Sequence, residues 1–141
     1  MSIKHSYTII CDDVRREDNG KLLILGMYLG TIAVPQLPSL LPSFTVLSIF
    51  ESDRPGAWSW KLAIQRLESG KTIVEAKGFA NVQQPGPGVM PIKFGGLRFD
   101  ETGAYAAIVE IEGQPEPFVT NFMVVLTPQI MPQQQMPFPG R

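Results

Sequence analysis

Short apolar segments with a two-residue period, separated by turn signals, are the dominant pattern along this chain. The clearest example is WSWKLAIQ, in which Trp58, Trp60 and Leu62 share one side of an extended chain and mostly polar side chains take the other. Turn signals recur every ~8–12 residues, a spacing typical of sandwiches and barrels, and helical periodicity is nearly absent. The pattern predicts an all-β fold, an antiparallel two-sheet β-sandwich of about eight strands.

Glycines and prolines divide the apolar runs into these elements. Gly26 and Gly30 break the run from Lys21 to Val34, which indicates one bent strand or two strands. The stretch VQQPGPGVMP, residues 82–91, is predicted to be a long loop because its prolines and glycines cannot continue a ladder. The sequence Asp18-Asn19-Gly20 favours a hairpin turn.

The chain is expected to form one domain, residues 1–127, followed by a tail, residues 128–141. The tail reads PQIMPQQQMPFPGR, is rich in Pro, Gln and Met, and is predicted to be flexible, either extended or disordered. The apolar positions that share inward faces give the expected core: Tyr7, Ile9, Leu23, Leu25, Val46, Trp58, Trp60, Leu62, Ile64, Tyr105, Val109, Ile111, Phe122 and Val124.

Composition narrows the classes of partner and compartment. The formal net charge is −1 at pH 7, so no basic field exists to collect phosphates and nucleic acid is not an expected partner. No stretch approaches the ~20 apolar residues of a membrane span, and no membrane partner is expected. The single cysteine, Cys11, rules out an internal disulfide, and no signal peptide is recognised, so a cytoplasmic location is expected.

The densest group of ionisable residues lies in the stretch CDDVRREDNGK. Asp12, Asp13, Glu17 and Asp18 are weak candidates for a calcium site, because calcium prefers clustered oxygen ligands. The spacing is not that of a calcium-binding loop, and two interleaved arginines offset the carboxylates. The main interpretation is therefore a solvated turn between two strands.

Other catalytic and cofactor chemistry finds little support. The one histidine, His5, and the one cysteine cannot supply a zinc site, and six residues of strand would separate them by ~20 Å. No nucleophile elbow and no phosphate-binding glycine loop are present. We therefore expect a protein that is not an enzyme and carries no cofactor.

Two kinds of apolar feature are candidates for binding. An exposed Trp58 and Trp60 pair would offer a stacking platform for sugars, although its continuity with aliphatic residues favours the core. Apolar residues in the Pro-rich connector and in the tail are candidates for contact with a protein partner: Leu37, Leu40, Leu41, Ile130, Met131, Met136 and Phe138.

The N-terminal third of the chain also carries a family resemblance. The stretch YTIICDDVRREDNGKLLILGMY, with the connector that follows to Phe44, resembles an uncharacterised family of small bacterial proteins. In that family an ICDD-R-E…GK…GxY opening precedes an all-β domain. The later stretch GLRFDETGAYAAIVEIEGQPEPFVTNFMVVL resembles the last strand pair of Ig-like or C2-like sandwiches. The resemblance implies the fold and a bacterial or phage-associated origin, and brings no known activity or catalytic residue.

The functional expectation follows from these observations together. It is a non-enzymatic binding or assembly module that acts through contacts with a protein partner or with further copies as a homo-oligomer. The alternative is a β-sandwich that binds calcium or carbohydrate.

Overall fold

The computed structural model describes residues 3–128, and over that range the chain is all-β, as predicted, without a helix. It has eleven strands there, three more than the eight or so expected. They are β1 (Ile3–Arg16), β2 (Leu22–Met27), β3 (Thr31–Val34), β4 (Ser39–Leu41), β5 (Phe44–Ser52), β6 (Gly56–Arg66), β7 (Thr72–Val82), β8 (Gly86–Phe94), β9 (Leu97–Phe99), β10 (Gly103–Ile111) and β11 (Phe118–Leu126). Across the described residues no helix is long and apolar enough to cross a membrane.

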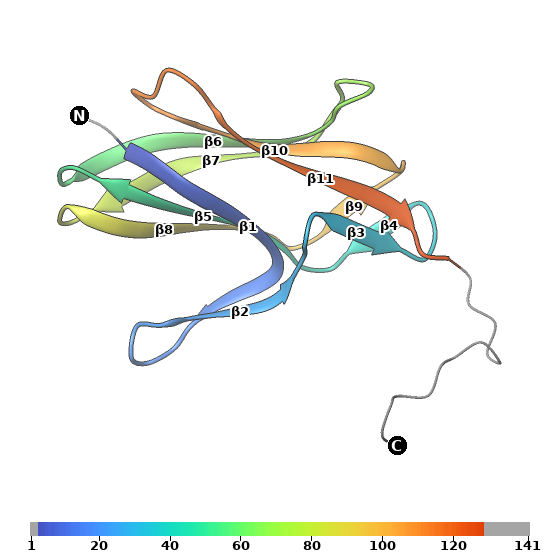
Figure 1. The fold of residues 1–141 in the computed structure, drawn as a ribbon, viewed down its shortest axis with the longest axis horizontal. Helices are drawn as coiled ribbons and strands as arrows, with labels where there is room; N and C mark the ends of the chain where they lie inside the picture. The colour runs from blue at the N-terminus through green and yellow to red at the C-terminus, as the bar shows by residue number, and fades with distance from the viewer. Residues whose placement is uncertain (1–2, 129–141) are drawn as a thin grey trace.

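Two larger sheets form layers on either side of the main core (Figure 1). One has four strands in the order β2-β1-β5-β8, and the other has five in the order β3-β11-β10-β6-β7. A third, two-stranded sheet pairs β4 with β9. The structure also departs from a purely antiparallel arrangement, because β3 runs parallel to β11. This pairing joins segments about ninety residues apart, which local pattern cannot reveal.

The main core contains most of the residues expected there, including Val46, Trp58, Leu62 and Val109. An aromatic group forms its centre, with the Tyr105 ring centroid 5.2 Å from Phe99 and 5.7 Å from Phe122. Ile9 and Trp60 are only partly buried. Three predicted core residues are wrong, because Tyr7, Leu23 and Leu25 are 54%, 45% and 37% exposed.

The predicted loop at residues 82–91 is also wrong in its second half, since β8 begins at Gly86. Strand β8 pairs antiparallel with β5 on one side and ends the four-stranded sheet on the other. Pro87 and Pro91 are tolerated because an edge strand needs hydrogen bonds on one side only.

Strand β1 belongs to two pairings in succession. Its first part pairs with β5 as far as Cys11, opposite Thr45, and its last part pairs only with β2 as far as Arg16, opposite Leu22. Past Cys11 the strand bends away from β5 and carries β2 with it, so the β1–β2 hairpin projects from the body of the fold (Figure 1). This hairpin contains the charged stretch of the sequence.

Candidate functional site

The tip of the β1–β2 hairpin has the turn that its sequence predicts. Glu17 N donates to Lys21 O at 2.8 Å, and Gly20 N donates to Glu17 O at 2.9 Å. Gly20 takes a φ of 85°, which glycine adopts without steric cost, whereas Asn19 does not take a positive φ. The result is a three-residue hairpin loop with glycine in the left-handed position.

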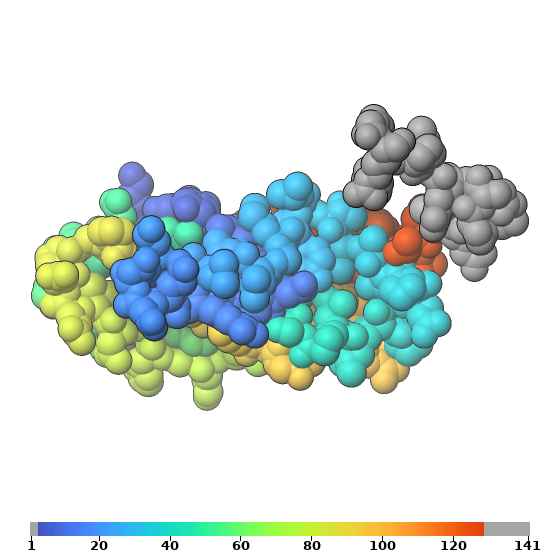
Figure 2. Space-filling view, turned by 90° about the horizontal axis from the view of Figure 1, so that it is seen from below, coloured from blue at the N-terminus to red at the C-terminus, as the bar shows by residue number. Residues whose placement is uncertain are grey.

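The inner side of the hairpin closes over a small second core. Cys11 and Val14 are buried there against Leu47 of β5, and Leu22 and Ile24 of β2 pack around them. Figure 2, coloured from blue at the N-terminus, shows the hairpin spread across this face of the molecule. Burial also raises the pKa of the Cys11 thiol, which disfavours the thiolate that a nucleophile needs.

The outer side of the hairpin carries an apolar row. Leu23, Leu25 and Met27 alternate with the inward residues of β2 and are 45%, 37% and 52% exposed. Leu29, just beyond the strand, is 86% exposed. These four residues, here called the β2 row, lie beside a strand edge that no other described strand covers.

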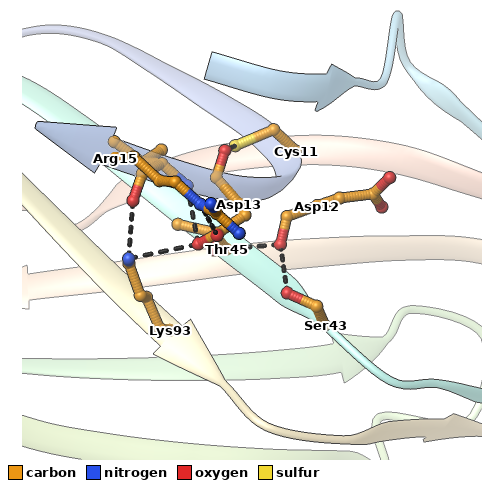
Figure 3. Close-up of polar contacts among 8 residues, drawn as sticks. Cys11, Asp12, Asp13, Arg15, Ser43, Thr45 and Lys93 are labelled. Carbon is orange, nitrogen blue, oxygen red and sulfur yellow. Dashed lines mark hydrogen bonds and ion pairs between the residues drawn. The ribbon is translucent and has the colours of Figure 1, made fainter. Parts of the chain in front are cut away.

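A polar network anchors the hairpin to β8 (Figure 3). Lys93 Nζ lies 3.1 Å from Asp13 Oδ1 and also donates to Val14 O, while Arg15 Nε lies 3.1 Å from Asp13 Oδ2. The hydrogen bonds from Lys93, Arg15 and the Val14 N–H lower the pKa of Asp13 below its ordinary value. Asp13 therefore remains ionised as a structural counter-ion.

Asp12 points away from this network. Its carboxylate accepts a hydrogen bond from Tyr28 Oη at 2.8 Å, and its backbone oxygen accepts from Ser43 and Thr45 (Figure 3). Burial, followed by the bond to Asp12, raises the pKa of Tyr28 to about 12. Gly26 lies so close that a Cβ there would collide with Asp12 Oδ2.

The four acidic candidates for calcium are thus divided by the structure. Asp12 and Asp13 serve different partners, and Glu17 and Asp18 lie exposed in the turn. In residues 3–128 there is no group of three or more His, Cys, Asp or Glu side chains that could hold a metal ion. This arrangement gives calcium no common coordination point.

The edge of β2 differs from the other three edges of the two larger sheets. β8 is interrupted by prolines, β7 carries Glu75 and Lys77, and β3 is only four residues long. Prolines, charges and short length are the usual devices that stop one sheet from adding to another. The sequence of β2, LLILGM, contains neither proline nor charge.

The three candidate leucines of the Pro-rich connector differ in how deeply they are buried. Leu37 and Leu41 are partly buried against the main core and close one end of it, whereas Leu40 of β4 is 66% exposed. The four tail candidates, Ile130, Met131, Met136 and Phe138, lie outside the described residues.

The tryptophan pair does not form the platform considered from the sequence. Trp58 is only 1% exposed and belongs to the core, while Trp60 is partly buried and lines an open groove with a volume of about 810 Å³. Sequence reasoning missed this groove, because it depends on how the loop between β10 and β11 meets β6 and β7 (Figure 1).

Comparison with known proteins gives a family but no activity. The sequence matches the family of unknown function DUF6941 over residues 6–121. The chain belongs to this family. The match runs from β1 into β11, so it covers the hairpin and both larger sheets, and it confirms the expectation of an uncharacterised family.

Two further comparisons add little to this assignment. No curated protein matches the DUF6941 chain. Among solved structures, a β-glucosidase, EmGH1 from Erythrobacter marinus, is similar with a TM-score of 0.47 and 17% sequence identity. The similarity covers 88% of this chain and 15% of the glucosidase chain, so the chain spans a small part of that protein's length.

Proposed function

We propose that this DUF6941 protein is a non-enzymatic assembly module that associates through the free edge of β2. The two larger sheets would act as an Ig-like or C2-like sandwich that holds the hairpin in place. The proposal places the chain in the cytoplasm, which the single free thiol of Cys11 permits. The observation that carries the proposal is the edge of β2, which is apolar and carries no proline or charge.

The chemistry of this edge specifies another strand as its partner. β2 pairs with β1 on one side, so within residues 3–128 the outward N–H and C=O groups of alternate residues have no neighbouring strand on the other. Strand addition satisfies such groups, and side chains on one face then supply the apolar contact. Leu23, Leu25 and Met27 supply that contact here.

The simplest partner is β2 of a second copy, paired antiparallel about a two-fold axis, because it requires no other protein. The β2 row contains only Leu and Met, so self-pairing sets apolar side chains against apolar side chains and brings no like charges together. A two-fold interface uses one surface twice, which is the commonest arrangement in soluble oligomers. The product would be a continuous sheet built from two four-stranded sheets.

Light scattering of the purified full chain tests this proposal. We expect a dimer or larger assembly for the unchanged protein and a monomer for Leu23→Lys combined with Leu25→Lys, because charges on an edge block sheet addition. Leu67→Lys is the matched control, since Leu67 is 48% exposed and lies in the turn after β6. A monomer for the unchanged protein across the accessible concentrations would reject self-assembly through β2.

A further inference from the structure

The open groove is built from two strands and one loop at the same end of the five-stranded sheet. Phe79 of β7 supplies aromatic surface on the outward face of the sheet, where Ser59 is its register partner, and Pro115 and Pro117 of the β10–β11 loop also line the groove. Trp60 faces the core side of the same sheet, and its ring lies directly on the backbone of Gly78, where a Cβ would be 2.8 Å from Trp60 Cζ2. Phe79 is 73% exposed, so most of its ring surface is open to contact.

The charges around the groove carry an excess of carboxylate. Lys61 and Lys77 lie opposite each other on β6 and β7, and Glu110 is the register partner of Lys61 on β10. Glu112 and Glu116 add two carboxylates from the loop, so three acidic side chains face two basic ones. None of these five side chains forms an ion pair with another described residue. The groove therefore fits an extended apolar segment that carries one positive charge.

The chain itself contains such a segment just after β11. Residues 129–141 contain three prolines, apolar side chains such as Phe138, and a single charged side chain, that of Arg141. Pro-rich segments are recognised by grooves lined with aromatic side chains, because their extended form is already ordered. The composition of the segment thus matches both the aromatic lining and the charge of the groove.

The length of the extended segment determines which of its residues can lie in the groove. The groove adjoins the start of β11 at Pro117, and the nine residues of β11 place its end roughly 30 Å away. An extended Pro-rich chain covers ~3.1 Å per residue, so about ten residues after Pro128 are needed to return. The outward side chains of Met123 and Val119, 43% and 53% exposed, provide an apolar path along β11.

We propose that residues 129–141 of this chain are the occupant of the groove, with Phe138 against Phe79, and Arg141 beside Glu110, Glu112 and Glu116. The segment returns along the outward face of β11 in the same copy, or enters the groove of a second copy. The groove lies on a different sheet from the β2 edge, so this proposal stands independently of association through β2.

Nuclear magnetic resonance of the full chain tests the proposal by a substitution in the segment, with signals of the groove as the readout. We expect Phe138→Ser to shift the amides of Gly78 and Phe79, and the matched polar change Gln134→Ser to leave them in place. No shift at Gly78 or Phe79 would overturn the proposal. Movement of those signals on adding a soluble oligosaccharide, with no effect of Phe138→Ser, would instead assign the groove to a sugar.

A second variant tests the proposal by a substitution in the groove, with a signal of the segment as the readout. Phe79→Ser should sharpen the methyl signal of Met136, because the segment loses its anchor, and Leu40→Ser should not, since Leu40 lies in the β4–β9 sheet. Phe79 is mostly exposed, so this variant keeps the fold. A Met136 signal that is already sharp in the unchanged chain would overturn the proposal. Dilution separates the two geometries, because only docking into a second copy weakens as concentration falls.

Discussion

Asp13 is the residue through which the hairpin is most directly tied to the rest of the molecule. Lys93 and Arg15 each approach its carboxylate to 3.1 Å and, with the Val14 N–H, lower its pKa. A carboxyl whose pKa is lower in the folded than in the unfolded chain stabilises the fold above the unfolded pKa, near 3.8, and this contribution is lost as pH falls through the folded pKa.

The prediction for Asp13 follows from the downward shift of its pKa. Asp13→Asn should lower the urea midpoint at pH 7, and its effect should disappear in acid below the lowered pKa, where the native carboxyl is already neutral. Asp18→Asn, in the exposed turn, makes the same change of charge and should have little effect at either pH. Urea unfolding at both pH values measures this. An undiminished Asp13→Asn effect in acid would show that shape, not charge, matters at this position.

Tyr28 gives a second prediction at the residue scale. Its hydroxyl donates to Asp12 at 2.8 Å, so Tyr28→Phe leaves a partly buried carboxylate without that donor and should cost about 1–2 kcal/mol of unfolding free energy. Tyr7→Phe, at a ring that is 54% exposed, is the control. The pKa of Tyr28 is raised from 10.0 to about 12, so stability from the neutral phenol is present below pH 10.0 and lost as pH rises through about 12. Ultraviolet titration should show the group with a pKa of about 12 disappear in Tyr28→Phe.

Single residues also show where the sequence was sufficient. Val46, Trp58, Leu62 and similar core positions were predicted correctly because a two-residue period assigns them to one face. Leu23 and Leu25 were assigned to the core wrongly. In their run the residues on both faces of the strand are apolar, so the pattern cannot show which face is buried. The packing of Leu22 and Ile24 on β5 shows that their face points inward.

At the scale of elements, the shape of β2 depends on Gly26. Its φ of 64° disfavours any other residue, and a Cβ would collide with the Asp12 carboxylate. Gly26→Ala should therefore cost about 1–3 kcal/mol, as expected for strain at a special backbone position. Gly20→Ala is the matched control, since Gly20 also has a positive φ but open space around its Cβ position. Thermal unfolding measures both, and equal losses would show that the contact with Asp12 contributes nothing.

The elements that sequence missed are those whose pairing is set at a distance. The first part of β8, up to Pro91, was predicted as a loop because its prolines and glycines weaken a ladder, yet its partner β5 supplies all the pairing that an edge strand needs. β4 is only three residues long and pairs with β9 across more than fifty residues of chain. The candidate groove has the same origin, because its lining comes from three separate parts of the chain.

At the scale of the whole molecule, the described part of the chain contains two apolar cores of unequal size. The main core lies between the two larger sheets, whereas the second is a small group around Cys11, Val14 and Leu47 beneath the hairpin. Regions with few buried contacts open locally at a lower free energy than the rest of a domain. The hairpin, which presents the proposed edge, is therefore expected to open while the two larger sheets stay folded.

Native-state hydrogen exchange of the β2 amides tests this separation with two matched substitutions. Leu47 and Leu62 are each 0% exposed, one in the small core and one in the main core, and Leu→Ala at such sites costs about 2–5 kcal/mol. Contacts of Leu47 are lost when the hairpin opens, so Leu47→Ala should lower both the local and the global opening free energy. Contacts of Leu62 survive that opening, so Leu62→Ala should lower only the global value and leave β2 exchange unchanged. If Leu62→Ala accelerates β2 exchange as much as Leu47→Ala does, the hairpin opens only when the whole domain unfolds, and the edge of β2 is held as rigidly as the core.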